Sequence, residues 1–183
     1  MRPSSNPSKP DAGPFFYRSL DAAKQGNVFW LNAVFKRILP FNAPHGIRVL
    51  TFSDEEVRVA LPDRRANRNH LKGTHACAIA TACEFCSGLA VLAQFDMKDY
   101  RLIMNRLEVD YMRRPVKGRC MAKADISPNL REEVQQLMES SADGAARFVM
   151  PSLLLDASGE TVARATVHWH VKAWDDVKYK PTA

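Results

Sequence analysis

The sequence predicts an α+β fold in which one antiparallel sheet wraps around a single long helix. The helix is predicted from residues 75–94, where Glu84 is the only charged residue. A helix that is apolar on every side is typical of one buried inside a protein. The sheet is predicted from segments of alternating apolar and polar residues, which are joined mostly by short turns. The 183 residues suffice for one well-buried core but not for two.

The elements are expected in the following order along the chain. Residues 1–14 are rich in proline and serine, which predicts a disordered tail. Apolar residues recur at helical spacing over residues 27–39, so one amphipathic helix is expected there, and Pro40 ends it. Alternating patterns predict strands over 47–51, 57–61, 102–112, 118–126, 146–156 and 161–172, with a short helix over 127–142. The predicted boundaries are a tail over 1–14, an N-terminal helical extension over 15–44, the main domain over 45–175 and a C-terminal tail over 176–183.

The net charge of +6 would suit nucleic acid, an anionic membrane or a phosphorylated small molecule. Nucleic-acid binding usually combines basic residues with exposed aromatic ones, and the basic segments here offer only Tyr111. A transmembrane span is disfavoured because Glu84 would be costly in lipid and because alanine, cysteine and glycine are only weakly hydrophobic. We therefore expect neither nucleic acid nor a membrane as a partner.

Four cysteines crowd mainly into the predicted helix: Cys77, Cys83, Cys86 and Cys120. This is a poor disulfide framework, and the chain begins without an export signal, so a cytoplasmic location is expected. The CEFC motif lies in the middle of the helix, and the other two cysteines do not form a second metal-binding pair. We therefore interpret the cysteines of this motif as small apolar side chains that pack in the protein core, and we expect no metal and no cofactor.

One motif at the start of the predicted helix matches a known family. The chain carries Asn69, then Gly73 four residues later, His75 two further on, and Glu84 nine after the histidine. With these spacings, and with YMRRPVKG as an aromatic-led turn closed by glycine, the chain resembles hotdog-fold thioesterases of the phenylacetyl-CoA type over roughly residues 48–172. The N-terminal helix resembles an extension found in a poorly characterised branch. The resemblance implies a hotdog fold, with an antiparallel sheet wrapped around one long central helix and an extra N-terminal helix.

The resemblance also implies hydrolysis of acyl thioesters of coenzyme A or of an acyl-carrier protein. Glu84 would be the general base or nucleophile, and its apolar neighbours should raise its pKa toward neutrality. The amide of Ala76, at the positive end of the helix, would donate to the oxyanion. His75 would orient or polarise the carbonyl, and Asn69 would hold water or the thioester. Taken singly, these residues have plainer interpretations: a buried glutamate satisfied by an arginine or by backbone amides, and an asparagine and a histidine that cap the helix or its loop.

Two positions depart from the family pattern. Ala76 stands where the family has glycine, and Met104 stands where a serine or threonine often assists, with Asn105 beside it. A second hypothesis is therefore a non-catalytic hotdog protein that binds acyl-CoA or fatty-acyl ligands. A third is a basic nucleic-acid binding protein.

Helix geometry requires a second subunit for catalysis. Nine residues of helix separate His75 and Glu84 by about 13 Å and place them on opposite faces. We therefore expect a homodimer or a tetramer, in which two helices run antiparallel about a twofold axis. The residues expected to contact the substrate, including the phosphates of coenzyme A, are Gly73, Asn105, Arg113, Arg114 and Lys117.

Overall fold

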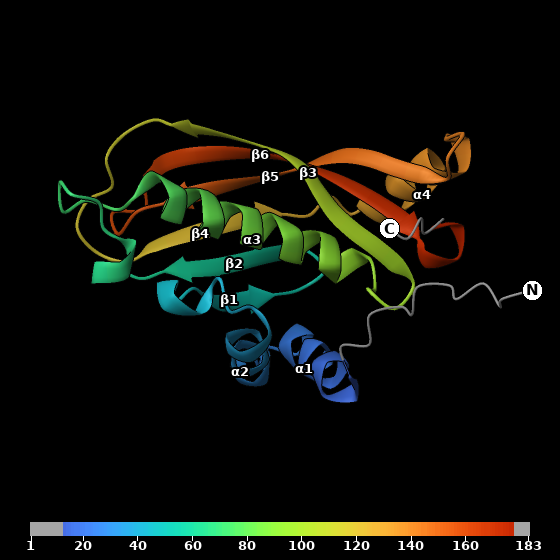
Figure 1. The fold of residues 1–183 in the computed structure, drawn as a ribbon, viewed down its shortest axis with the longest axis horizontal. Coiled ribbons are helices and arrows are strands. Elements are labelled where there is room, and N and C mark those ends of the chain that lie inside the picture. The colour runs from blue at the N-terminus through green and yellow to red at the C-terminus, as the bar shows by residue number, and fades with distance from the viewer. Residues whose placement is uncertain (1–12, 178–183) are drawn as a thin grey trace, which may run out of the picture.

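The computed structural model describes residues 13–177. The predicted tails over residues 1–14 and 176–183 therefore lie almost entirely outside the described residues. The helix α3 (Ala76–Gln94) lies across one face of a curved six-stranded sheet, and a pair of N-terminal helices packs beside the first strand (Figure 1). This arrangement confirms the predicted α+β fold.

The six strands form one antiparallel sheet in the order β1-β2-β4-β5-β6-β3. Their bounds are β1 (Arg48–Phe52), β2 (Glu56–Leu61), β3 (Tyr100–Tyr111), β4 (Cys120–Asp125), β5 (Ala145–Leu155) and β6 (Thr161–Ala173). Each strand begins and ends within about two residues of the prediction from alternating patterns. The helix α4 (Leu130–Ser140) lies between β4 and β5, inside the range expected for it.

The central helix α3 contacts all six strands. Hydrogen bonds between α3 and the strands β5 and β6 fix its position on the sheet. The Ser87 hydroxyl donates to the Met150 carbonyl at 2.7 Å, and the Trp169 indole donates to Ser87 Oγ at 2.9 Å. The Ser152 hydroxyl donates to the Cys83 carbonyl at 2.9 Å. By length and composition α3 could cross a membrane, but its place inside the sheet accounts for its apolar character.

The cysteines of the CEFC motif face the core. Cys83 and Cys86 are both fully buried. Burial raises the pKa of Cys83 to about 12, so its thiol stays protonated at neutral pH and is a poor nucleophile. The motif thus packs as apolar helix surface.

The N-terminal extension contains two helices, whereas the sequence patterns predicted one. The helix α2 (Phe29–Ile38) lies within the predicted range, but α1 (Pro14–Lys24) was missed. Pro14 occupies the first turn of α1, where proline is well tolerated, and Phe16 and Ala23 are buried on one face at helical spacing. These two signals could have revealed α1, which lies almost wholly within the predicted extension but outside the one helix expected there.

The two edges of the sheet differ. At the β1 edge, Asn32 on α2 bonds to Val49 as a neighbouring strand would: Nδ2 donates to the Val49 carbonyl at 2.9 Å, and Oδ1 accepts from the Val49 amide at 2.8 Å. At the other edge lies β3, which has 12 residues. Within the described part of the chain, no segment pairs with the outer side of β3, so this edge is open.

Candidate active site

Glu84 lies near the middle of α3, on the side of the helix that the sheet leaves partly uncovered. The exposed or half-buried residues on this side recur at helical spacing and are Cys77, Ala80, Thr81, Glu84 and Gly88. All of them except Glu84 are small. Glu84 is therefore the one carboxylate among small side chains on this part of α3.

The Glu84 carboxylate has no hydrogen-bond or ion-pair partner among residues 13–177. Desolvation by the surrounding protein raises its pKa, and no neighbouring cation opposes the shift. The plainer interpretation, a structural glutamate satisfied by an arginine or by amides, therefore lacks its partner among the described residues. A desolvated carboxylate without a partner lowers stability, and such groups cluster at functional sites.

Gly88, one helical turn after Glu84, shapes the space beside the carboxylate. A Cβ atom at position 88 would lie 3.0 Å from a ring carbon of Trp169 and 3.9 Å from Glu84 Oε1. The indole of Trp169 thus packs directly against the helix at this point. Gly88 therefore has the indole of Trp169 close on one side and the Glu84 carboxylate within van der Waals reach on the other.

The loop before α3 is held together by Asn69. Its Oδ1 accepts from the amides of Leu71 and Gly73, both at 3.0 Å, and its own amide donates to the Gly73 carbonyl at 2.8 Å. Lys72 completes the turn with a φ of 59°. Because Oδ1 is engaged in the loop, Nδ2 is the part of Asn69 left to bind water or a substrate.

The start of α3 presents two donors. His75 is the N-cap residue, and its Nδ1 accepts from the Cys77 amide at 3.0 Å. The neutral ring therefore carries its proton on Nε2, which can donate. The Ala76 amide has no partner within residues 13–177, as expected for the first position of a helix. Both donors lie at the positive end of α3, where an oxyanion would be stabilised.

The predicted catalytic residues form two groups that are separated within one chain. The first group, at the start of α3, contains Asn69, Gly73, His75 and Ala76. Glu84 follows nine residues after His75, which corresponds to about 13 Å along the helix axis and to the opposite face.

A basic pocket of about 320 Å³ lies beside the first group. Its cationic lining residues are Arg68, Lys72, Arg114 and Lys117. Arg114 Nη2 donates to the Leu71 carbonyl at 3.1 Å, and the guanidinium lies against Gly73, where a side chain would crowd it. The pocket thus brings together three of the predicted substrate contacts, Gly73, Arg114 and Lys117. Arg68 and Lys72, which were not predicted, line the same pocket.

Arg113 takes a different position from its neighbour Arg114. Its Nη2 donates to Asp156 Oδ2 at 2.7 Å. Hydrogen bonds from the Ser158 hydroxyl and the Val116 amide, together with the charge of Arg113, hold the pKa of Asp156 well below its usual range. Of the two arginines, only Arg114 lines the basic pocket; Arg113 anchors the segment between β3 and β4.

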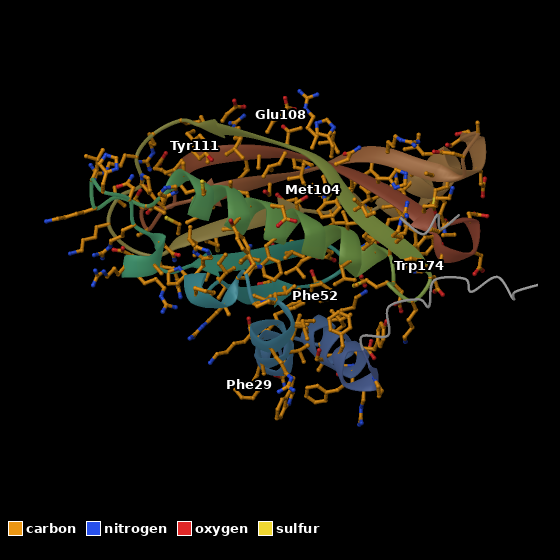
Figure 2. The ribbon with its side chains drawn as sticks, in the orientation of Figure 1. Phe29, Phe52, Met104, Glu108, Tyr111 and Trp174 are labelled. Atoms are coloured by element: carbon orange, nitrogen blue, oxygen red, sulfur yellow. The ribbon has the colours of Figure 1, made fainter. Side chains whose placement is uncertain are left out.

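The strand β3 carries two further features near the site. A bulge between Met104 and Arg106 leaves Asn105 outside the register with β6, and both Met104 and Asn105 are exposed. At the end of β3, the Tyr111 hydroxyl donates to the Ala76 carbonyl at 3.1 Å, close to the first turn of α3 (Figure 2). This contact ties the strand to the helix start. Sequence patterns placed Tyr111 in a turn but gave no sign of its bond to the helix.

The sequence matches a protein family over residues 29–171, from the first residue of α2 to near the end of β6. The family is described as a domain of unknown function, DUF4442. The chain belongs to this family. The match includes both groups of candidate catalytic residues and the basic pocket. No match was found among curated proteins.

Solved structures share the fold of this DUF4442 protein. A Pseudomonas aeruginosa protein of unknown function, named a probable thioesterase, has a TM-score of 0.69 at 22% identity and covers 78% of this chain and 93% of its own. A mutant thioesterase from the same organism has a TM-score of 0.62 at 18% identity and covers 78% and 91%. A mutant thioesterase from Staphylococcus aureus has a TM-score of 0.59 at 11% identity and covers 73% and 98%. At such identities these likenesses establish the fold alone, and it is the predicted hotdog fold.

Proposed function

We propose that this DUF4442 protein hydrolyses acyl thioesters, with Glu84 as the general base or nucleophile. The observation that carries the proposal is a desolvated carboxylate without a partner on the uncovered side of the central helix. The spacing of Asn69, Gly73, His75 and Glu84 supports it, as do the thioesterase names of proteins with the same fold.

The proposed site is completed by a second copy of the chain. The open edge of β3 can pair antiparallel with the same edge of a second copy about a twofold axis. The two α3 helices would then run in opposite directions, and the start of one would approach the middle of the other. Ala80 is small enough for close approach. Each site would combine the first group of one chain with Glu84 of the other.

The proposed reaction uses groups that each half of the site supplies. The thioester carbonyl oxygen accepts from the Ala76 amide and from His75 Nε2. Glu84 takes a proton from water, the water oxygen adds to the carbonyl carbon, and negative charge moves to the carbonyl oxygen. When the carbonyl re-forms, the carbon–sulfur bond breaks and the thiolate takes the proton from Glu84. A raised pKa suits a group that must both accept and return a proton.

The alternative step is direct attack by Glu84 on the carbonyl carbon. This step would expel the thiolate and leave a mixed anhydride, which water would then hydrolyse to the free acid and the carboxylate.

The basic pocket supports coenzyme A or phosphopantetheine as the thiol carrier. Lys72, Arg114 and Lys117 lie beside the loop that holds Asn69, so phosphate groups bound there would place a thioester near the start of α3. Binding without hydrolysis is the second candidate function. It is favoured by the side chains of Ala76 and Met104, because the first adds a methyl group beside the oxyanion donor and the second cannot donate a hydrogen bond.

Glu84→Gln tests the proposed function, because the amide keeps the volume of the side chain but cannot act as a base. Hydrolysis of a panel of acyl-CoA thioesters is followed with a thiol-trapping dye. We expect a loss of about 10²- to 10⁴-fold, with the fold and ligand binding unchanged. Glu139→Gln, on an exposed position of α4, is the matched control and should keep full activity. A Glu84→Gln variant as fast as the parent refutes the role of Glu84. A parent that binds the esters without hydrolysing them supports the second function.

A further inference from the structure

A cavity of about 700 Å³ lies between α2, β1 and α3. Its lining runs from the turn before α2, along that helix, to the start of β1, and Phe85 of α3 forms part of the wall. The volume is within the range of small-molecule sites, about 300 to 1,000 Å³. Asn69, His75 and Glu84 do not line it, so it is distinct from the candidate active site.

Three cationic side chains reach this cavity from separate segments: Lys36 on α2, Arg48 at the start of β1, and Arg64 after β2. No acidic residue is among the lining residues. Within residues 13–177 none of the three cations has an ion-pair partner. The cavity rim therefore carries three exposed positive charges that the described part of the chain does not neutralise.

The Arg64 side chain lies over Gly46 at the cavity. Gly46 has a φ of 64°, and a side chain at this position would collide with the Arg64 guanidinium. Glycine suits the left-handed turn, and the absence of a side chain leaves room for the end of the Arg64 side chain. This arrangement keeps the Arg64 charge at the cavity wall.

The cavity also has an apolar wall. The rings of Phe35 and Phe85 meet edge to face with centroids 5.3 Å apart, which joins α2 to α3. Both rings line the cavity, together with Val28 and Ile47. One side of the cavity therefore suits a hydrocarbon or an aromatic ring, while the cations suit a negative charge.

We propose that this cavity binds a small amphipathic anion, that is, an apolar chain or ring that carries one carboxylate or phosphate group. The anionic group binds among Lys36, Arg48 and Arg64, and the apolar part packs on Phe35 and Phe85. A neutral ligand would leave the three cations without a counter-charge, and a hydrophilic anion would leave the aromatic wall in water. Only a ligand with both properties satisfies the whole lining.

Calorimetric titration of the intact chain tests this proposal. Octanoate and octyl phosphate supply the two head groups on the same chain, while octanol and octyltrimethylammonium supply a neutral and a cationic control. We expect saturable binding of one anion per chain and binding of both controls at least about tenfold weaker. Comparison of octanoate with octyl phosphate identifies the preferred head group.

Variants of α2 locate the bound anion. Lys36→Gln should weaken octanoate binding about tenfold, because it removes one charge-assisted contact. Arg37→Gln is the matched control, since Arg37 is the next residue on α2 but does not line the cavity. Ala33→Trp should abolish binding by filling the cavity from an exposed helix position, with the fold checked by circular dichroism.

Three results would overturn the proposal: no saturable binding, equal affinity for octanol, or full binding by Ala33→Trp. Hydrolysis of acyl thioesters is measured in parallel and should be unchanged in Ala33→Trp. Loss of both properties would make the cavity part of the thioester site and would overturn its assignment as a separate one. A parent that binds octanoate but hydrolyses no thioester refutes the proposed function and leaves this binding site supported.

Discussion

Two inactive variants should restore activity when they are mixed, if each site is shared between two chains. Asn69→Ala removes the side chain that holds the loop before α3, through its bonds to the amides of Leu71 and Gly73. Glu84→Ala removes the carboxylate. Each change damages one component at both sites of a homodimer, so each variant alone should be inactive.

The size of the recovery follows from twofold symmetry. Random pairing of equal amounts makes about half of the dimers mixed. A mixed dimer has one site with the intact loop of the Glu84→Ala chain and the intact carboxylate of the Asn69→Ala chain, while its other site lacks both. Activity should therefore return to about a quarter of the wild-type value at the same total protein.

The assay unfolds the two variants together, refolds them and measures thioester hydrolysis over a range of mixing ratios. Activity should follow the product of the two fractions and should be greatest at equal amounts. The variants refolded separately and then combined are the first control. The second control mixes wild type with the double variant: no mixed dimer has an intact site, so activity should fall with the square of the wild-type fraction.

Sites contained within one chain predict a different pattern. The two inactive variants would then show no recovery at any ratio, and dilution with the double variant would reduce activity only in proportion. Either result would refute the shared site. A parent that light scattering shows to be monomeric while active would refute it as well.

Three further changes test separate parts of the structure. Glu84→Gln should raise the melting temperature at about pH 8 and have no effect near pH 3. The reason is that a group with a raised pKa makes the parent less stable as it ionises. Equal effects at both pH values would exclude ionisation of Glu84 as the cause. Arg114→Glu should weaken the binding of coenzyme A esters, measured by calorimetry, far more than the binding of short-thiol esters. Arg113→Glu should mainly lower the melting temperature, because it breaks an ion pair to a buried carboxylate. The opposite pair of results would contradict the positions of the two arginines. Gly88→Ala should lower the melting temperature, because the new methyl would lie 3.0 Å from the Trp169 ring. Helix propensity alone predicts the opposite, since alanine is the better helix former by about 1 kcal/mol. A higher melting temperature would show that the ring can move aside.

The sheet and the central helix were predictable because their signals are local. In β4, for example, Cys120, Ala122 and Ala124 are buried while the residues between them are more exposed, which is the alternation that the sequence displays. The helix α3 was recognised from its length and apolar composition alone. The helix α1 gave a weaker signal, because it follows directly on a proline-rich stretch and only one of its faces is buried.

The candidate site was predictable as a set of residues but not as a set of contacts. Arg113 and Arg114 are adjacent and carry the same charge, so no local pattern separates them. Their partners decide the difference: Asp156 lies 43 residues after Arg113, and Leu71 lies 43 residues before Arg114. The bond from Tyr111 to Ala76 at the start of α3 spans 35 residues, and it too required the folded chain.

The difference between the two sheet edges also limits how far the protein can assemble. Pairing through β3, as proposed, uses the open edge of both copies at once, and each copy then presents only β1, where Val49 is already bonded to Asn32. A sheet with two open edges could instead add copies one after another and grow into a fibre. In the proposed dimer, the helix α2 would thus stop growth through β1, and a substitution at Asn32 would free a second edge for pairing.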